Sequence, residues 1–319
     1  MSLMIDISNY ERYPNNVFKP INIANGYKLY LVRFNSLYDL YDFLKSNPQI
    51  NHKVFYELGS IDGSYDFAGV PYEEAVENLV REIKDNNFDN FLKIQSSLDN
   101  CINIPVNKYR TINTLAGGHL NIPAYSSGTP LCYETEERIM KPKFVKANVL
   151  LSYRFGTTKE QVFNRAIIII NVLKALEKAG YKIDLNTFSL ARCNYEYIHV
   201  VVKIKDYNEK LNMASLYKTL CQVEFLRRII FRLREITDVK DSWNGGYGTT
   251  CDVKEVKSIL KCDDNELFFG QPDEVGVYGE NLEDDFDRMI DSIGLGDKIN
   301  IEEAKKNFNT QVKRLTRGK

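Results

Sequence analysis

The segment from residue 159 to 179 restricts the possible folds of this chain more than any other. Its apolar residues recur at helical spacing and leave only a narrow polar stripe, Glu160, Asn164, Asn171, Lys174 and Lys178. A helix so apolar has to be largely buried, most simply against a sheet. Thr158 and Gln161 have the spacing of a capping box at its start, and Gly180 is placed to end it.

Strand-like segments flank this helix. Residues 146–153 contain the contiguous run Val149, Leu150 and Leu151, which is typical of a strand covered on both faces. Two further strands are expected at 181–190 and 197–204, followed by a second long helix over 212–236. The order strand, helix, strand predicts an α/β fold with a parallel or mixed sheet and covering helices, of the A-domain or Rossmann kind.

The rest of the chain suggests three regions. Residues 1–130 are expected to form a mostly helical N-terminal region, wrapped on the core and ending in a loop rich in Gly, Pro and Ser. Residues 140–280 are the expected α/β core, and residues 281–319 combine an acidic segment with a basic C-terminal helix. The composition of the loop at 114–130 favours a linker between the two regions. The alternative is a loop that carries function.

Composition excludes several classes of protein. The chain has 42 Lys and Arg against 43 Asp and Glu, a net charge of −1, which argues against a histone-like coat for nucleic acid. Its longest purely apolar run, Ala166 to Ile170, is far shorter than the roughly 18 residues of a membrane-spanning helix. We therefore expect no membrane partner and a cytoplasmic location, where the six cysteines stay free thiols.

Catalytic signatures are weak. The two glycine-rich segments, 114–130 and 242–250, have neither a Gly-Lys-Ser/Thr phosphate loop nor a G-x-G-x-x-G pattern, so no cofactor is predicted. His119 in the first of them is the one histidine we would test as a general base. His199 lies inside an expected strand and is interpreted as a packing residue.

Charge is unevenly distributed toward the C-terminus. Residues 273–287 carry seven acids and no Lys or Arg, without the register of a calcium-binding loop. This acidic run is interpreted as a solvated face that could pair with the basic C-terminal helix over 301–315. Four residues of that helix are candidates for binding nucleic acid, with a solvated tail as the alternative: Lys305, Lys306, Lys313 and Arg314.

The segment 225–235 predicts a binding patch. At about 100° per residue its apolar residues share one face, and Arg228 and Arg232 fall on the opposite arc with Phe231 among them. An outward Phe flanked by Arg is typical of an interface, with protein favoured over nucleic acid as the partner. Local ion pairs with Glu224 and Glu235 are the alternative explanation for the arginines.

The strand at 147–153 and the helix R-A-I-I-I-I-N-V-L-K-A-L-E-K-A-G-Y resemble the opening of a von Willebrand factor A domain. In that family the first strand ends in D-x-S-x-S and helps to bind a divalent cation. The matching residues here are Leu150-Leu151-Ser152-Tyr153-Arg154, of which only Ser152 fits. The resemblance thus implies an A-domain-like core with a degenerate position in place of the metal site.

G-H-L-N-I-P-A-Y-S-S-G-T-P, the same helix and G-G-Y-G also occur in this order in an uncharacterised family encoded mainly by bacteriophages. This likeness spans roughly residues 35–290. It implies a non-enzymatic phage accessory or virion-associated protein that works through protein–protein contacts. The alternatives are an enzyme on nucleotides or nucleic acid that uses the 114–130 loop, and a DNA-binding accessory that uses the C-terminal helix.

Overall fold

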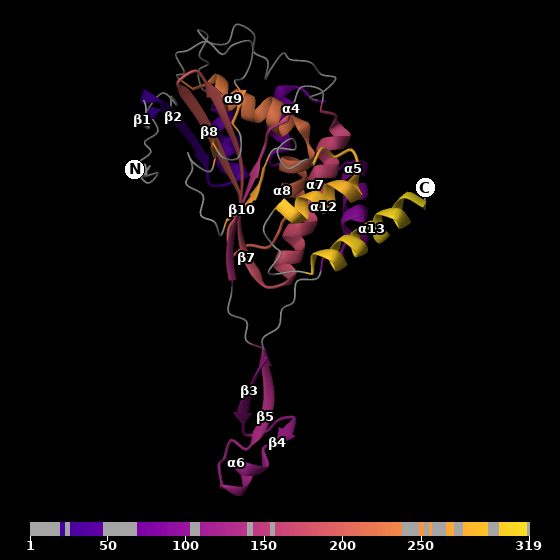
Figure 1. The fold of residues 1–319 in the computed structure, drawn as a ribbon. Coiled ribbons are helices and arrows are strands. Elements are labelled where there is room, and N and C mark those ends of the chain that lie inside the picture. The colour runs from indigo at the N-terminus through magenta and orange to yellow at the C-terminus, as the bar shows by residue number, and fades with distance from the viewer. Residues whose placement is uncertain are drawn as a thin grey trace.

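The computed structural model of the chain describes residues 20–22, 26–46, 69–102, 109–138, 143–153, 157–237, 249–251, 255–256, 266–270, 277–292 and 300–317. These residues form an α/β body, from one end of which a slender arm projects (Figure 1). The expected α/β class with a mixed sheet and covering helices is confirmed.

The body is built on one mixed sheet. Its strands are β1 (Pro20–Asn22), β2 (Lys28–Phe34), β6 (Lys143–Leu150), β7 (Tyr181–Cys193), β8 (Glu196–Lys205), β9 (Thr249–Thr250) and β10 (Leu267–Phe269). They lie in the order β1-β2-β8-β7-β6-β10, and β9 pairs with β7 off this path. The pairs β2–β8, β6–β7 and β6–β10 are parallel, whereas β1–β2, β7–β8 and β7–β9 are antiparallel.

The central β6–α7–β7 unit follows from local sequence signals. Helix α7 (Lys159–Lys178) begins with the expected capping box. Thr158 Oγ1 accepts a hydrogen bond from the Gln161 N–H at 3.2 Å, and Gln161 Oε1 accepts one from the Thr158 N–H at 2.7 Å. Gly180 then ends the helix with a φ of +85°, a left-handed conformation that glycine adopts without strain.

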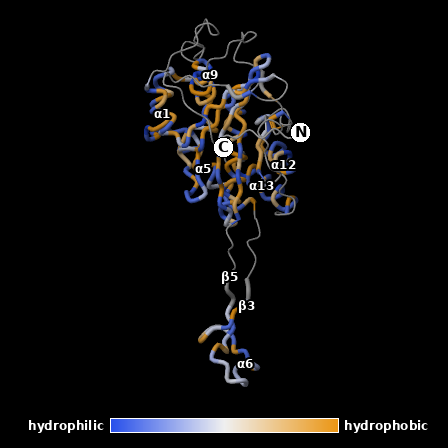
Figure 2. The backbone as a smooth tube through the Cα atoms, turned by 90° about the vertical axis from the view of Figure 1, so that its left-hand side faces the viewer, coloured by the Kyte–Doolittle hydropathy of each residue, from blue (hydrophilic) through white to orange (hydrophobic). Residues whose placement is uncertain are grey.

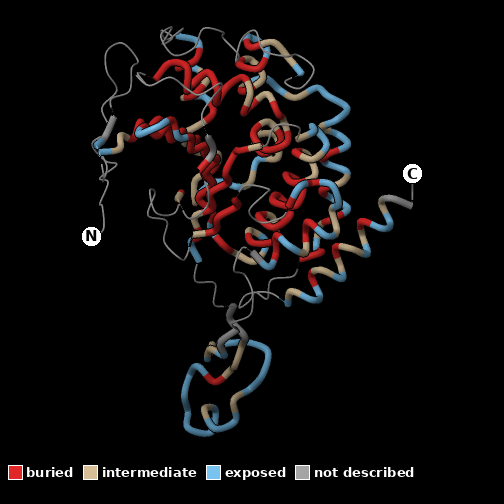
Figure 3. The backbone as a smooth tube through the Cα atoms, turned by 45° about the horizontal axis from the view of Figure 1, so that its top comes forward, coloured by how far each residue is buried: buried red, intermediate tan, exposed pale blue. Residues whose placement is uncertain are grey.

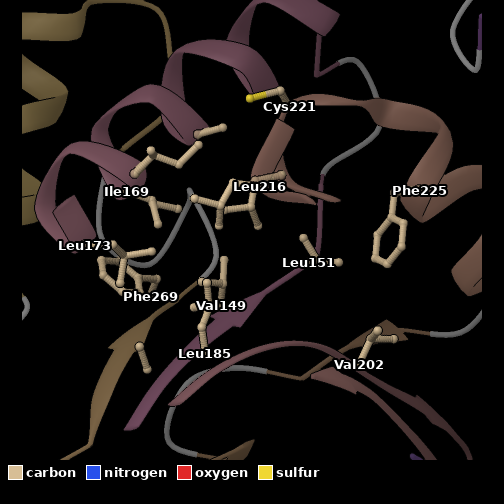
Figure 4. Packing of buried hydrophobic residues seen from close by; sticks show 14 of the residues in the cluster. Val149, Leu151, Ile169, Leu173, Leu185, Val202, Leu216, Cys221, Phe225 and Phe269 are labelled. Carbon is tan, nitrogen blue, oxygen red and sulfur yellow. The ribbon is translucent and has the colours of Figure 1, made fainter. Parts of the chain in front are cut away.

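The helix layer covers one face of the sheet. Helices α1 (Leu37–Lys45), α4 (Tyr72–Asn78), α5 (Asn86–Ser97) and α7 join the sheet in one large apolar cluster. Figure 4 shows Ile169 and Leu173 of α7 directed toward Val149 and Leu185 of the sheet. A smaller cluster, which includes Leu29, Leu150 and Phe188, lies on the opposite face.

The N-terminal part contributes to the sheet, which differs from the mostly helical region expected for residues 1–130. Strand β2 pairs in parallel with β8, from Lys28 opposite Glu196 to Phe34 opposite Val202. Tyr30, Val32 and Phe34 of β2 are buried in the large cluster. The sequence could not show this pairing, because the two strands are distant in the chain and each is extended by its own local pattern.

The segment expected as one long helix over 212–236 is divided into four pieces. They are α8 (Met213–Leu216), the π-helices η3 (Tyr217–Cys221) and η4 (Phe225–Ile230), and α9 (Phe231–Glu235). Gln222 has an extended backbone, with φ −101° and ψ 124°, and separates η3 from η4. Because a π-helix has more residues per turn than an α-helix, faces drawn at 100° per residue do not hold here.

Two C-terminal helices, α12 (Leu282–Ser292) and α13 (Ile301–Arg317), pack against each other. The rings of Phe286 and Phe308 stack with 3.8 Å between their centroids. Lys305 Nζ lies 3.0 Å from the Asp291 carboxylate, and Lys313 Nζ lies 3.7 Å from that of Glu283. Glu283 belongs to the acidic run 273–287, so its pair with Lys313 agrees with the expected contact between that run and the basic helix, whereas Asp291 lies after the run.

Two further expectations concern cysteines and membranes. The described cysteines, Cys101, Cys132, Cys193, Cys221 and Cys251, are buried and form no disulfide, as expected, and Cys262 lies outside the described residues. Among the helices that the structure describes, none has the length and apolar character needed to cross a membrane.

Candidate functional site

The arm, residues 109–138, is a small sheet with a helix at its tip, where the sequence suggested a linker or an irregular loop at 114–130. It consists of β3 (Tyr109–Thr114), β4 (His119–Leu120), α6 (Ile122–Ser126) and β5 (Tyr133–Arg138). Strand β5 lies between β3 and β4 and pairs antiparallel with both. The arm stands apart from the body in Figures 1 and 3.

Turn chemistry explains the Gly, Pro and Ser content of the arm. The Asn121 side chain caps α6 by accepting the Ala124 N–H at 3.0 Å, and its amide donates to the Glu134 carboxylate at 2.5 Å. A Cβ at Gly117 would lie 3.0 Å from Thr114 Oγ1 and 3.3 Å from Thr135 Cβ, so a larger residue would crowd these two side chains. The segment is thus a compact structural unit with its own hydrogen bonds.

Large apolar side chains are exposed at the end of the arm. Five of the ten exposed large apolar side chains in the described residues occur here, between 44% and 71% exposed: Leu115, Leu120, Ile122, Tyr125 and Leu131. We call these five residues the apolar tip. Figure 2 shows apolar positions in the arm, and Figure 3 shows that most of the arm backbone belongs to exposed residues.

The tip also lacks charge. No Asp, Glu, Lys or Arg occurs between Arg110 and Glu134, in a chain of which 27% of the residues are charged. The cores of protein–protein interfaces show the same combination of aromatic and apolar residues with few charges. The sequence analysis singled out the loop at 114–130 but did not predict these five residues as a binding surface. The absence of charged residues over this stretch was the sequence signal that could have indicated them.

His119, the candidate general base, is exposed on β4 of the arm, where it pairs in register with Glu134. Catalytic bases usually act in concave sites that enclose most of a substrate. The described part of the arm places no such enclosure around His119. The structure therefore assigns this histidine to a projecting surface, far from the helical layer of the body (Figure 1).

The predicted outward patch of Phe231, Arg228 and Arg232 is corrected by the structure, because all three side chains are buried. Phe231 is 9% exposed and lies between two guanidinium groups, of Arg227 at 5.1 Å and Arg234 at 5.2 Å. Arg228 Nε donates to the Val70 carbonyl at 2.9 Å.

The physical reason for this burial is twofold. The π-helical register turns the side chains away from the directions drawn for an α-helix, and α4 packs over the side expected to face solvent. The local pair of Arg232 with Glu235 exists, with 3.4 Å between nitrogen and oxygen. These residues therefore pack inside the body. The prediction that they contact a partner was based on an exposed Phe231, and Phe231 is buried.

The basic residues of the C-terminal helix have mixed surroundings. Lys305 and Lys313 form the ion pairs with α12 described above, while Lys306 and Arg314 are exposed. Glu302 and Glu303 lie in the first turn of the same helix. The basic surface is therefore interrupted by carboxylates, and it belongs to the body, whereas His119 belongs to the arm.

Ser152, the degenerate metal position, follows β6 and is 3% exposed, and its hydroxyl has no hydrogen-bond partner. Nearby, burial raises the pKa of the Tyr153 hydroxyl, and the neighbouring Arg165 partly opposes that shift. Among the described residues, no group of three or more His, Cys, Asp or Glu is arranged to hold a metal ion.

Comparison with known proteins yields one match. A family model described as "Domain of unknown function (DUF7192)" matches residues 12–297, which is most of the chain. No curated protein and no solved structure matches significantly.

Proposed function

Because the chain belongs to the DUF7192 family of unknown function, we propose its function from the geometry: it is a non-enzymatic binding or assembly module. Its arm docks the apolar tip into an apolar recess on a different protein. The observation that carries this proposal is the concentration of exposed apolar side chains on a projecting arm, within a stretch, 111–133, that has no Asp, Glu, Lys or Arg.

Burial energetics favour docking of the tip. Removing a Leu or Ile side chain from water contributes about 1.5–3 kcal/mol, and Tyr is enriched among the residues that dominate binding energy. Ile122 and Tyr125 both belong to α6, are more than 60% exposed, and are separated by one helical turn. They can therefore enter one recess together, as neighbours on the same helix face.

The chemistry of the tip favours protein over nucleic acid as the partner. Binding to a phosphate backbone depends on Lys and Arg, and the sequence between Arg110 and Glu134 has none. Asn121 is already committed to α6 and Glu134, which leaves the apolar side chains as the main contacts of this surface.

A different protein is favoured over a second copy of the chain. The remaining exposed large apolar residues of the described body are scattered over three elements, the β7–β8 turn and the segment before α12, which offers no matching apolar face: Tyr38, Leu92, Phe144, Tyr195 and Tyr278. We therefore infer that the receptor for the tip belongs to another protein.

The proposal includes a biological setting. We place the protein in the cytoplasm of a bacterial host, as a phage accessory or virion-associated protein with an A-domain-like core. The sequence resemblance supports this setting, and the β6–α7–β7 unit has the strand and buried helix that the resemblance implies. Co-purification with intact virions would distinguish a virion component from an accessory protein.

The experiment introduces a photo-crosslinking amino acid at Tyr125 in phage-producing cells and identifies the protein that becomes attached. Affinity is then measured between the two purified proteins by calorimetry. We expect the double variant Ile122→Ser/Tyr125→Ser to bind at least about 100-fold more weakly, since each lost anchor costs on the order of 1.5–3 kcal/mol.

The matched control is Tyr38→Ser, which removes a side chain on α1 that is 67% exposed, against 64% for Tyr125. It should bind as tightly as the unmodified protein. Equal affinity of the double variant and the unmodified protein would overturn the proposal. So would crosslinking to a second copy of the chain, or flotation of the protein with neutral lipid vesicles that is lost in the double variant.

A further inference from the structure

A cavity of about 820 Å³ lies in the body, at the break between η3 and η4. One wall comes from α4 and the turn after it, and the other from the residues around Gln222, with Lys159 of α7 at the side. The volume is within the range of small-molecule sites, which is about 300–1,000 Å³. Nothing in the proposed function of the arm uses this cavity.

Glu224 brings a carboxylate to the cavity. In the part of the chain that the structure describes, this carboxylate makes no hydrogen bond or ion pair with another side chain. Its pKa is raised from 4.5 to about 7, mainly by burial and to a smaller extent by Glu74 and Asp85, while a hydrogen bond from its own backbone N–H and the charge of Lys159 act in the opposite direction. The group therefore carries a negative charge above neutral pH with no cation bound to it.

The other polar groups at the cavity have roles of their own. Tyr217 donates its hydroxyl to Asp85 Oδ2 at 3.4 Å. Lys218 Nζ donates to the backbone carbonyls of Leu79 at 3.2 Å and Arg81 at 2.6 Å, and burial lowers its pKa. The Cys221 thiol stays neutral because burial raises its pKa well above the ordinary value.

The remaining cations are at the edge. Lys159 is exposed at the start of α7, Arg81 is exposed in the turn after α4, and Lys84 forms an exposed ion pair of 3.7 Å with Glu82. The cavity thus combines the Glu224 carboxylate with apolar walls, to which Leu79, Val223 and Ile229 contribute, and the exposed residues Glu74 and Asp85 line it as well. Burial penalises the charged form of this carboxylate, and a bound cation would offset that penalty.

We propose that this cavity binds a small organic cation, a primary ammonium on an apolar chain, whose charged end pairs with the Glu224 carboxylate. A free diamine and the side chain of a lysine in a peptide share this chemistry. A metal ion fits less well, since hard cations require several oxygen ligands and no group of three or more His, Cys, Asp or Glu among the described residues is arranged to hold one. The break at Gln222 agrees with the proposal, because π-helical interruptions occur frequently at functional sites.

The experiment measures binding of two probes to the full chain by titration calorimetry: 1,4-diaminobutane and the peptide acetyl-Gly-Lys-Gly-amide. Each is tested at pH 8 and at pH 5.5, and 1,4-butanediol serves as the neutral probe. We expect at least one amine to bind, at least tenfold more tightly at pH 8 than at pH 5.5. Near pH 7 binding should release a proton, which appears as a dependence of the enthalpy on the buffer.

The variant Glu224→Gln should lose this binding while keeping the fold, since it only replaces a buried charge by an amide of the same shape. The control Glu82→Gln removes an exposed carboxylate at the edge of the same cavity and should bind like the unmodified chain. Binding of the diamine alone identifies a free amine as the ligand, and binding of the peptide alone identifies a protein side chain.

Failure of both amines to bind at pH 8 would overturn the proposal, as would equal binding by Glu224→Gln. The proton release by the unmodified chain gives an independent readout should Glu224→Gln fail to fold. The arm variant Ile122→Ser/Tyr125→Ser is expected to bind the amines normally, so the two proposals can fail separately.

Discussion

The guanidinium group of Arg232 lies over the ring of Tyr72, 5.5 Å from its centroid. Arg232 is 6% exposed, and Tyr72 belongs to α4, which comes from a distant part of the chain. The contact joins α4 to the helix that follows the π segments, on the side expected to face solvent. It therefore links two covering helices directly to each other, in addition to the contacts that they make with the sheet.

Replacing Tyr72 by Leu should destabilise the protein by about 1–2 kcal/mol, because a buried cation over an aromatic face gains about this much. The free energy of unfolding is measured in urea. The control Tyr38→Leu changes an exposed tyrosine of α1 and is expected to shift stability by less than about 0.5 kcal/mol. Equal effects of the two substitutions would contradict the role of this contact.

Local signals explain which parts of the fold could be predicted from the sequence. Thr158 and Gln161 mark the start of α7 and Gly180 marks its end, so the β6–α7–β7 unit was predicted with its caps. The pairing of β2 with β8 depends on contacts between distant segments, and no local pattern encodes it. The π-helices over 217–230 were also not predicted, because hydrophobic periodicity was evaluated at 100° per residue, the angle of an α-helix.

The two candidate sites, the apolar tip and the cavity at Glu224, were not predicted from the sequence, for different reasons. The arm has short strands with mixed polar residues, and its apolar tip is identified as exposed only once the arm is seen to leave the body. Glu224 is a single acidic residue between Val223 and Phe225 in a segment expected to be buried. That position was its one sequence signal, and Glu224 entered the sequence analysis only in the alternative explanation, as an ion-pair partner of Arg228.

Gly279 provides a test of how α7 is fixed to the segment before α12. Its φ is +77°, and a Cβ would overlap the backbone carbonyl of Gln161. Its own N–H donates to the Asp285 carboxylate at 2.6 Å, and its carbonyl accepts from Asn164 Nδ2 at 2.8 Å. Gly279→Ala therefore combines backbone strain, a clash with the first turn of α7 and the loss of these hydrogen bonds.

We expect Gly279→Ala to cost at least about 3 kcal/mol of unfolding free energy, measured by thermal and urea denaturation. Gly26→Ala is the matched control, since Gly26 has the same φ of +77° with no heavy atom within 4 Å of the added carbon. It should cost only the left-handed strain, about 1–2 kcal/mol. Similar losses for both variants would show that the close approach to Gln161 is unimportant.

Glu224 should make the unliganded protein less stable as pH rises. Its pKa is about 7 in the folded chain against 4.5 ordinarily, so below pH 4.5 the group is protonated in both states and has no effect. Between pH 4.5 and 7 the folded state increasingly bears the cost of the buried charge. The full penalty above pH 7 is on the order of 3 kcal/mol.

Glu224→Gln should accordingly match the unmodified protein at pH 4.5 and exceed its stability at pH 8 by up to about 3 kcal/mol. Urea denaturation at pH 4.5, 6 and 8 checks this difference. Glu82→Gln, at an exposed position, should follow the unmodified protein at every pH. A gap between Glu224→Gln and the unmodified protein that does not change with pH would exclude a raised pKa of the carboxyl.

His199 should act in the opposite direction. Burial, assisted by the positive charges of Arg33 and Lys146, lowers its pKa from 6.5 to about 3. The imidazole packs edge-to-face on Phe188 with 5.8 Å between ring centroids, and its Nε2 has no hydrogen-bond partner. Because the folded state favours the neutral ring, the contribution of His199 to the free energy of unfolding is fully present above pH 6.5 and is lost as pH falls toward 3.

Between pH 6.5 and 4.5 this loss amounts to about 3 kcal/mol, at 1.36 kcal/mol per pKa unit. His199→Gln lowers stability at pH 8 because it removes the contact with Phe188, but it should lose about 3 kcal/mol less than the unmodified protein on acidification. The exposed control His119→Gln should keep the original acid sensitivity. The chemical shift of the Hε1 proton of His199 is expected to stay constant from pH 8 to 4.5. A titration of this resonance near pH 6.5 would refute the burial argument, because it would show that the ring becomes charged in the folded state as a solvated histidine does.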